Sequence, residues 1–132
     1  FDLVSTNSDQ ISLSSLAGEK VYLKFWASWC SICLAGMEEL NTLSGSDQDF
    51  KVITVVSPGS NGEKDEADFI EWFKSLEYEN ITVLLDNEGN LIKEYGIVGY
   101  PTSAYLDEEG YITKIVPGHV SNEDIIAAFD EK

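Results

Sequence analysis

Hydrophobic and polar positions along the chain follow two periods, one typical of strands and the other of helices. Short apolar runs rich in β-branched and aromatic residues predict strands at 21–26, 51–57, 81–85, 103–107 and 111–116. Apolar residues at helical spacing predict helices at 30–43, 65–76 and 122–129, with a shorter helical segment at 91–95. Residues 7–13 are expected to form an edge strand and a helical turn, whereas residues 1–6 carry no clear pattern. This order predicts an α/β fold around a mixed sheet.

The predicted helices have sides that should face the core. In the first helix, Cys33, Met37 and Leu40 share one face. The second helix is amphipathic, and its apolar side is made of four residues: Phe69, Ile70, Trp72 and Phe73. The N-cap of the closing helix is either Ser121 or Asn122.

The composition fits a single domain over residues 1–132, because domains usually contain about 100–200 residues. Eight basic residues against 24 acidic ones give a formal net charge of −16, which repels phosphate backbones and anionic lipid headgroups. We therefore expect no nucleic-acid partner, and the charge itself favours solubility. Glu38, Glu39 and the charged residues at 63–68 are expected to lie on solvated helix faces.

The sequence contains no stretch that approaches the roughly 20 apolar residues of a membrane-spanning helix. It begins at Phe1, without a basic segment followed by an apolar one. We expect a mature domain from which a targeting segment has been removed.

The only two cysteines, Cys30 and Cys33, lie where the strand at 21–26 passes into the following helix. The free N–H groups and the dipole of a helix N-terminus stabilise a negatively charged sulfur at Cys30. Cys33 lies one turn further along, close enough to form a disulfide with Cys30. In thiol–disulfide exchange one thiolate attacks a partner disulfide, and the second thiol resolves the mixed disulfide. We therefore expect Cys30 to attack and Cys33 to resolve.

Two other uses of this cysteine pair are weaker on chemical grounds. A structural zinc site needs about four ligands, and the chain has only two cysteines and one distant histidine. A purely structural disulfide that closes so short a loop would add little stability. A redox pair is therefore the favoured interpretation, with no metal and no cofactor.

The segment 25–33, Phe-Trp-Ala-Ser-Trp-Cys-Ser-Ile-Cys, resembles the active-site signature of the thioredoxin superfamily. Residues 96–102, Gly-Ile-Val-Gly-Tyr-Pro-Thr, are similar to the loop in which that family carries a cis-proline opposite the cysteines. The resemblance covers nearly the whole chain and implies a thioredoxin fold, with a central mixed β-sheet flanked by helices. It also implies a cis bond before Pro101 and pairing of the Tyr100 backbone with a substrate peptide. The alternative is an ordinary trans turn proline.

Other segments resemble the extracytoplasmic branch of the superfamily, typified by TlpA and ResA. Residues 12–18 precede the first core strand as in that branch, and three segments fit its central insert: 56–59, 69–76 and 81–86. Three short segments are most similar to extracellular thioredoxin lipoproteins of streptococci and to the thioredoxin-like N-terminal domain of secreted methionine sulfoxide reductases: 24–30, 57–59 and 68–69.

This closer resemblance implies a reductase that relays electrons to protein disulfides. Its partner would be an extracellular methionine sulfoxide reductase or another protein with a disulfide, and a membrane electron-transfer protein would restore the dithiol. Its location would be extracytoplasmic, as a bacterial cell-surface lipoprotein. It would touch the membrane only through an N-terminal anchor absent from this chain.

Several positions depart from the family pattern. Lys24 stands where thioredoxins keep an aspartate beneath the active site. Near the sulfurs its charge would favour a thiolate, whereas the alternative is a lysine that extends to solvent. Ser31 and Ile32 replace the usual Gly-Pro or Pro-Pro pair, so the residues that tune the thiolate differ and no redox potential can be carried over. Glu38 replaces the helix-kinking proline, which makes a kink doubtful, although Gly36 softens the helix.

The resemblance also predicts a substrate-binding groove around Cys30, formed by Trp29, Tyr100, Pro101 and the Gly118–His119 loop. Trp29 would shield the thiolate and contact partners, with simple packing as the alternative. His119 would lie near the active site, with an exposed turn histidine as the alternative.

Two other functions on this fold are alternatives. A thiol peroxidase needs a loop with proline and threonine before its peroxidatic cysteine, and no proline precedes Cys30. A module that binds client proteins without turnover would not need both Cys30 and Cys33. Thiol:disulfide exchange is therefore the favoured function.

Overall fold

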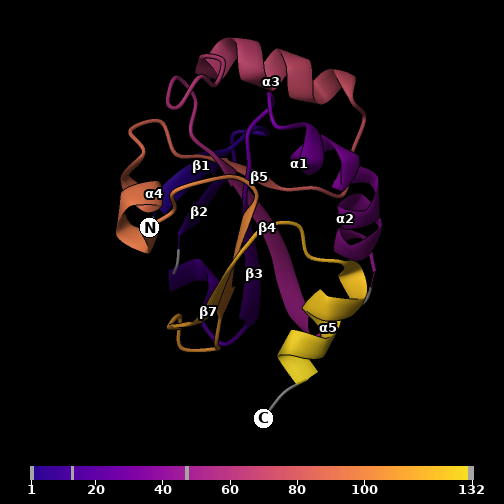
Figure 1. Cartoon of the computed structure of the whole chain (residues 1–132). Helices are drawn as coiled ribbons and strands as arrows, with labels where there is room; N and C mark the ends of the chain where they lie inside the picture. Colours follow the sequence, from indigo (N-terminus) through magenta and orange to yellow (C-terminus); the bar gives the residue numbers. More distant parts are fainter. Residues whose placement is uncertain (1, 13, 47, 131–132) are drawn as a thin grey trace.

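The computed structural model describes residues 2–12, 14–46 and 48–130. Its strands form one sheet in the order β2-β1-β5-β4-β3-β6-β7 (Figure 1). The strands are β1 (Asp2–Ser5), β2 (Gln10–Ser12), β3 (Lys20–Phe25), β4 (Phe50–Val56), β5 (Val83–Leu85), β6 (Thr102–Leu106) and β7 (Ile112–Pro117). Strands β3, β4 and β5 run parallel, whereas β6 and β7 at one edge and β1 and β2 at the other pair antiparallel. The sheet is therefore mixed, as the sequence predicts.

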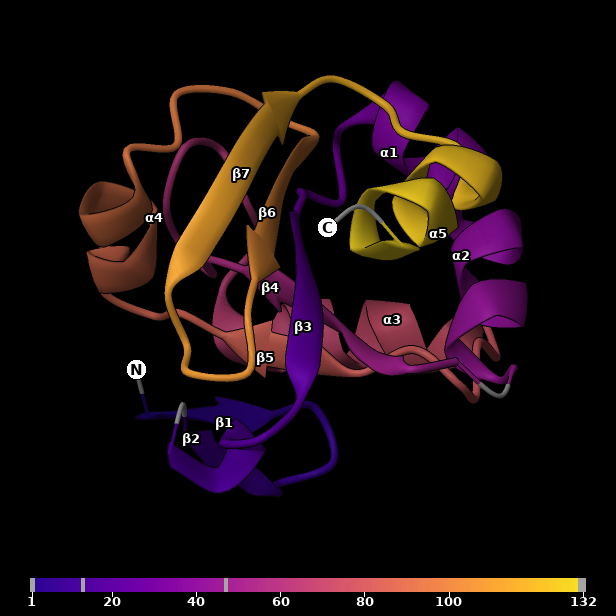
Figure 2. The same cartoon turned by 90° about the horizontal axis from the view of Figure 1, so that it is seen from below.

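Helices cover both faces of this sheet, as the view in Figure 2 shows. One core lies between the sheet and four helices: α1 (Ser31–Ala35), α2 (Met37–Ser44), α3 (Glu66–Ser75) and α5 (Asn122–Asp130). The second core lies on the opposite face, beneath α4 (Asn90–Tyr95) and the 3₁₀ turn η1 (Ser14–Leu16). The predicted arrangement of a mixed sheet between helices is confirmed.

Strand β3 separates the two cores, because successive side chains of a strand point to opposite faces of the sheet. Val21, Leu23 and Phe25 pack into the core beneath α4. Tyr22 and Trp26 pack into the core beneath α1, α2, α3 and α5. All five side chains are buried, so β3 has no solvent-facing side.

The predicted helix faces and one of the predicted caps are confirmed. Cys33, Met37 and Leu40 are all buried, as are Phe69 and Phe73 of α3. The other two residues of the predicted α3 face, Ile70 and Trp72, are partly buried and pack against the same core. At the start of α5, the hydroxyl of Ser121 accepts a hydrogen bond from the N–H of Asp124 at 3.2 Å. Ser121 is therefore the N-cap, and Asn122 is the first residue of the helix.

The prediction of one continuous helix over 30–43 is wrong, because the helix breaks at Gly36. The N–H of Gly36 bonds to the carbonyl of Cys33 at 3.2 Å, a short three-residue step that tightens the end of α1. Helix α2 then starts at Met37, and the N–H of Leu40 donates a hydrogen bond to the Gly36 carbonyl at 3.0 Å. The softening expected from Gly36 is thus a full break between two helices.

The other predicted strands are off by about one residue, whereas two strands depart further from the prediction because long-range pairing decides them. Residues 2–5, which carry no clear pattern, form β1 by pairing with β5 and β2. Strand β5 is shorter than the predicted 81–85, although the side chain of Ile81 is still buried. The predicted edge strand and helical turn near residues 7–13 occur as β2 and η1; Leu13 lies outside the described residues.

Candidate active site

Four segments of the chain meet at the end of the sheet where β3 and β4 terminate. Phe25 in β3 pairs with Val55 in β4 and with Thr102 in β6, which in turn pairs with Pro117 in β7. The segments that adjoin these paired residues therefore lie at one end of the sheet: 26–30, 57–64, 100–101 and 118–119. The carboxyl ends of parallel strands are the usual place for sites in α/β sheets.

Cys30 occupies the N-cap position of α1, immediately after the first of these segments. Its sulfur accepts a hydrogen bond from the N–H of Cys33 at 3.3 Å, so the first turn of the helix holds it. Both thiols are free, and Cys30 is 6% exposed while Cys33 is fully buried. Between them, Ser31 and Ile32 are exposed on the outer side of α1. A partner can therefore reach Cys30 more readily than Cys33.

Burial raises the pKa of the Cys33 thiol to about 12, and the hydrogen bond and charge of Cys30 add to the shift. A backbone hydrogen bond from Ala27 and the charge of Lys24 act in the opposite direction. Cys33 is therefore a protonated thiol at neutral pH, which suits a residue that waits until a mixed disulfide has formed.

Lys24 lies beneath the cysteine pair, on the face of β3 that also carries Tyr22 and Trp26. Only 3% of its surface is exposed, so the alternative of a lysine that extends to solvent is wrong. Burial lowers the pKa of Lys24, and the negative charges of three groups oppose the shift: Cys33, Glu39 and Cys30. The residue thus lies in the electrostatic field of both sulfurs.

An aromatic pair forms the surface next to Cys30. The rings of Trp29 and Tyr100 lie with their centroids 5.9 Å apart, and Trp29 is 55% exposed. The loop between β4 and α3 borders this pair: the side-chain amide of Asn61 donates a hydrogen bond to the Tyr100 hydroxyl at 3.4 Å. A Cβ on Gly62 would lie 3.6 Å from the indole nitrogen of Trp29. Trp29 and Tyr100, bordered by Asn61 and Gly62, thus form the surface beside Cys30.

Glu63 fixes that loop to the segment before Cys30, and its expected place on a solvated helix face is wrong. The side chain is buried, and its carboxylate accepts hydrogen bonds from the N–H of Ser28 at 2.6 Å and from the Ser28 hydroxyl. It also accepts one from the N–H of Lys64 at 2.8 Å. The sequence gives no signal for this contact, because Glu63 and Ser28 are far apart along the chain.

The loop after β7 lies beside the proline that precedes β6. The Tyr100–Pro101 peptide bond is cis, which agrees with the resemblance. The N–H of Gly118 donates a hydrogen bond to the carbonyl of Pro101 at 2.8 Å. Gly118 has φ of +91°, a backbone conformation that glycine adopts readily. This turn directs the chain toward His119, which is exposed and lies against α2.

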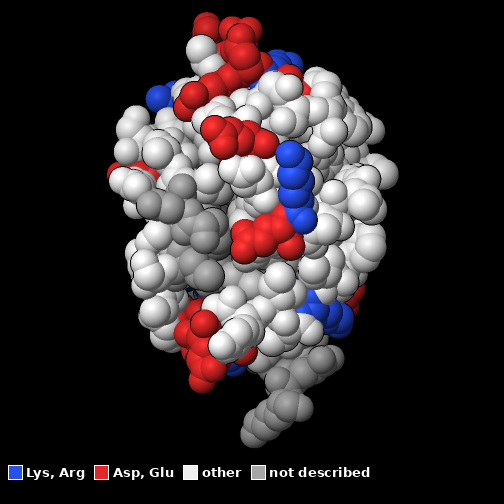
Figure 3. All heavy atoms as spheres, turned by 90° about the vertical axis from the view of Figure 1, so that its left-hand side faces the viewer, with Lys and Arg blue, Asp and Glu red and all other residues white. Residues whose placement is uncertain are grey.

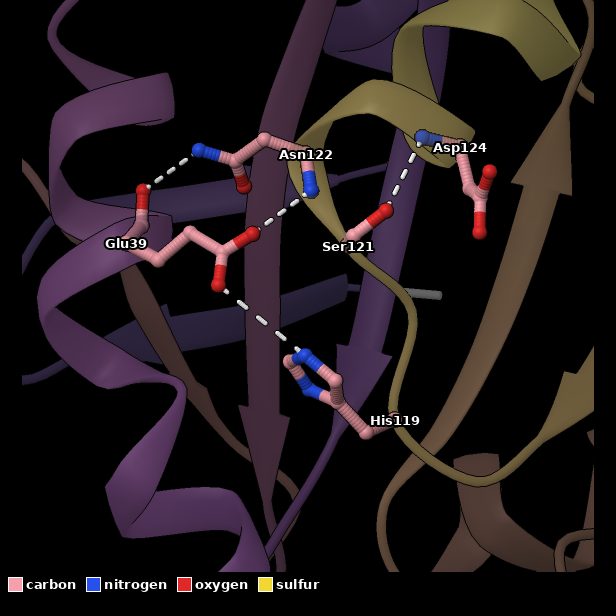
Figure 4. Close-up of polar contacts among 5 residues, drawn as sticks. All are labelled: Glu39, His119, Ser121, Asn122 and Asp124. Atoms are coloured by element: carbon pink, nitrogen blue, oxygen red, sulfur yellow. Dashed lines mark hydrogen bonds and ion pairs between the residues drawn. The ribbon is translucent and has the colours of Figure 1, made fainter.

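Glu39 connects His119 to the start of α5 (Figure 4). One carboxylate oxygen accepts a hydrogen bond from the N–H of Asn122 at 2.7 Å, and the other lies 3.9 Å from His119 Nε2. The Glu39 carbonyl accepts a further bond from the side-chain amide of Asn122 at 2.8 Å. Glu39 was expected to be a solvated helix residue; it is half-buried and joins α2, α5 and the loop after β7.

A family model described as Redoxin matches residues 1–128 of the chain. The chain belongs to the Redoxin family. It is 51% identical over 131 residues to an uncharacterized protein of Haemophilus influenzae, which covers 98% of this chain and 83% of that protein. It is 29% identical over 125 residues to sporulation thiol-disulfide oxidoreductase A of Bacillus subtilis, covering 95% of this chain and 74% of that protein.

The structure is also similar to the crystal structure of Etrx1, the exposed lipoprotein thioredoxin of Streptococcus pneumoniae. The TM-score is 0.96 at 44% identity, and the match covers 100% of this chain and 98% of the pneumococcal one. These similarities confirm the thioredoxin fold and the resemblance to thioredoxin-like proteins. This member of the Redoxin family is a thiol:disulfide oxidoreductase with a Cys30–Cys33 pair.

The surface of this Redoxin family member is strongly acidic. On the face that carries α4, acidic side chains occur from one end of the molecule to the other, with uncharged stretches and a few basic side chains among them (Figure 3). Within the described part of the chain, no helix is long and apolar enough to cross a bilayer.

Proposed function

We propose that the protein is a reductase in which Cys30 attacks a disulfide of a partner protein and Cys33 resolves the product. The Cys30 thiolate forms a mixed disulfide with one partner sulfur, and the other partner sulfur leaves as a thiolate. Cys33 then attacks Cys30, which releases the second partner thiolate and forms the Cys30–Cys33 disulfide. Two electrons pass from the cysteine pair to the partner. The observation that carries this assignment is the contrast between a reachable Cys30 at a helix N-terminus and a fully buried Cys33.

Exposed apolar residues next to Cys30 and in the loop before Pro101 support a protein as the substrate. Trp29 is 55% and Ile32 58% exposed, and Val98, in the loop that leads to Pro101, is fully exposed. Apolar residues gathered on a highly charged domain usually mark a contact site. In this proposal Tyr100 offers its backbone N–H and C=O to an extended segment of the partner, in the manner of strand addition.

The partner in this proposal is an extracellular methionine sulfoxide reductase, and a membrane electron-transfer protein restores the dithiol. In the same proposal, a lipid anchor holds the protein at the bacterial cell surface. Similarity to the exposed lipoprotein thioredoxin of Streptococcus pneumoniae supports this location.

A single-turnover experiment tests the proposed partner. Reduced protein is mixed with an oxidised secreted methionine sulfoxide reductase, and the free thiols of both proteins are labelled at successive times and counted by mass spectrometry. We expect the partner disulfide to disappear as the Cys30–Cys33 disulfide forms, and Cys30→Ser to abolish the reaction. Transfer to other protein disulfides but not to this reductase would refute the proposed partner.

The direction of electron flow has a separate test. The reduction potential of the Cys30–Cys33 couple is measured by equilibration with glutathione or with a thioredoxin standard. A reductase should give a value near that of thioredoxin, about −270 mV, whereas a value near about −120 mV would indicate a disulfide-forming oxidant instead.

A further inference from the structure

The loop between β4 and α3, residues 57–64, is folded onto itself beside the cysteine-bearing segment. The N–H of Gly59 donates a hydrogen bond to the carbonyl of Lys64 at 2.8 Å, which joins the two ends of the loop. Inside the loop, the N–H of Glu63 donates to the carbonyl of Ser60 at 3.0 Å. These bonds give the loop its shape, but its position over the site depends on the bonds that it forms with other segments.

The tip of the loop has a backbone conformation that outside contacts must maintain. Asn61 has φ of +53°, in the left-handed region, which a residue with a side chain seldom adopts unless its surroundings favour it. Its side-chain amide donates to the Tyr100 hydroxyl at 3.4 Å, longer than the usual length of about 2.7–3.2 Å. This one long bond is a weak anchor for the wall that Asn61 and Gly62 form beside Trp29 and Tyr100.

The end of the loop has a stronger anchor in Glu63. Its side chain is only 8% exposed, and both carboxylate oxygens accept hydrogen bonds. One oxygen accepts the N–H of Ser28 at 2.6 Å, and the other accepts the Ser28 hydroxyl and the N–H of Lys64, the latter at 2.8 Å. Hydrogen bonds to a carboxylate are roughly twice as strong as neutral ones. Because Ser28 lies just before Cys30 in the sequence, these bonds join the loop to the segment that carries the attacking cysteine.

The inward position of Glu63 also keeps its carboxylate away from the surface beside Cys30. The four residues of that surface are uncharged, whereas the whole chain carries a formal net charge of −16. The next residue, Lys64, is exposed, but its Nζ lies 5.5 Å from the centroid of the Trp72 ring on α3. A partner segment at this surface therefore meets aromatic rings and an amide, without an acidic group among them.

We propose that Glu63 is a positioning residue for partner recognition. By holding residues 57–64 to Ser28, its carboxylate fixes the wall of the surface beside Cys30 against which a partner segment lies. The inference rests on the proposed attack of Cys30 on a protein disulfide, and it adds a residue that favours protein substrates over small ones. A small disulfide reaches the sulfur without touching the wall, so Glu63 affects reaction with proteins and not the intrinsic reactivity of Cys30.

The test compares a protein disulfide with a small one. Reduced wild type and Glu63→Gln are mixed with insulin or with bis(2-hydroxyethyl) disulfide, and second-order rates are measured by labelling the remaining thiols. An amide has one oxygen and one NH₂ group, so in either orientation the N–H of Ser28 or of Lys64 faces a donor. We expect Glu63→Gln to lower the rate with insulin by about 10-fold and to leave the rate with the small disulfide within about twofold of wild type.

Two further variants separate the anchor from a change of charge or of stability. Glu71→Gln makes the same chemical change at an exposed position of α3 and should react like wild type with both disulfides. Ser28→Ala removes one of the donors to Glu63 and should slow the reaction with insulin by about threefold. In the Ser28→Ala background, Glu63→Gln should cost less than it does alone, because effects of residues in contact are not additive. Ser28→Ala also decides the test if Glu63→Gln does not fold.

Hydrogen exchange followed by mass spectrometry reports on the loop itself. We expect the backbone amides of residues 57–64 to exchange faster in Glu63→Gln than in wild type, while those of β3 keep their wild-type protection. Wild-type rates with insulin, equal losses with insulin and the small disulfide, or unchanged exchange of the loop would each overturn the role of Glu63.

The outcome is distinguishable from that of the proposed function. If wild type reacts with insulin but not with methionine sulfoxide reductase, the partner is wrong, and the insulin rates of Glu63→Gln still decide the role of Glu63. If wild type reduces the reductase and Glu63→Gln reacts like wild type with every disulfide, the role of Glu63 is wrong and the reductase assignment stands.

Discussion

The two faces of β3 are both buried, but one carries only apolar side chains and the other includes a lysine. Toward α4 the strand presents only apolar side chains, Val21, Leu23 and Phe25. Toward α1 and α2 lie Tyr22 and Lys24 of the strand and Trp26, which follows it directly, so a buried lysine lies between two buried aromatic residues. A buried amine without an ion pair is unfavourable for stability, because its charged form loses water without gaining a partner.

The two cores therefore have different roles. The core beneath α4 stabilises the sheet through apolar packing, and its ring contact between Phe25 and Tyr95 has centroids 5.7 Å apart. The core beneath α1 and α2 contains both thiols and the lysine, at a cost in stability. We therefore expect substitution of Phe25 and substitution of Lys24 to have opposite effects on the free energy of unfolding.

The largest effect is expected on the apolar face. Phe25→Ala should lower the free energy of unfolding by about 3–5 kcal/mol, because it removes a fully buried ring and leaves a cavity. Urea unfolding followed by tryptophan fluorescence measures the change, and Ile32→Ala, at an exposed site, is the control expected within about 0.5 kcal/mol of wild type. A small effect of Phe25→Ala would mean that this face is not the main source of stability.

The opposite sign is expected at Lys24. Lys24→Met should raise the free energy of unfolding at pH 7 by roughly 1–4 kcal/mol, since an apolar side chain of similar length fills the site without a buried charge. Because burial lowers the folded-state pKa, the unfolded chain binds more protons, and wild-type stability should approach that of the variant as pH rises toward 10.5. Destabilisation by Lys24→Met would show that Lys24 is paired after all.

A third effect, which depends on pH, should appear at Cys33 in the reduced protein under alkaline conditions. Its folded-state pKa of about 12 lies above the ordinary value of 9.0, so above pH 9 the unfolded chain loses this proton first. Stability should therefore fall with pH between about 9 and 12, by up to about 1.4 kcal/mol per pH unit. Cys33→Ala should lack this fall; parallel curves for the two proteins would contradict the assigned environment of the thiol.

The features that could be predicted from the sequence are those set by short, contiguous stretches of residues. The strand at 21–26, the cysteine pair and the helix after it are contiguous, and their periodicity and spacing do not depend on distant residues. The apolar face of α3 was predictable for the same reason, and the cap of α5 could be narrowed to Ser121 or Asn122. The family resemblance added the position of Pro101 opposite the cysteines, which no local pattern provides.

The features that could not be predicted from the sequence depend on contacts between distant segments of the chain. Glu63 and Ser28 are joined only because the loop after β4 folds over the segment before Cys30. Glu39 has the appearance of a surface helix residue until the start of α5 is placed beside it. His119 likewise lies against Gly36 only because the loop after β7 approaches from the other end of the chain.

The most direct test of the central claim is to trap the mixed disulfide. Cys33→Ser and Cys30→Ser are each incubated with an oxidised partner protein, and the covalent products are identified by non-reducing electrophoresis and peptide mass spectrometry. We expect Cys33→Ser to accumulate a mixed disulfide through Cys30, while Cys30→Ser forms almost none because the Cys33 thiol is buried and protonated. Accumulation of the complex by Cys30→Ser instead would contradict the assignment of Cys30 as the attacking thiol.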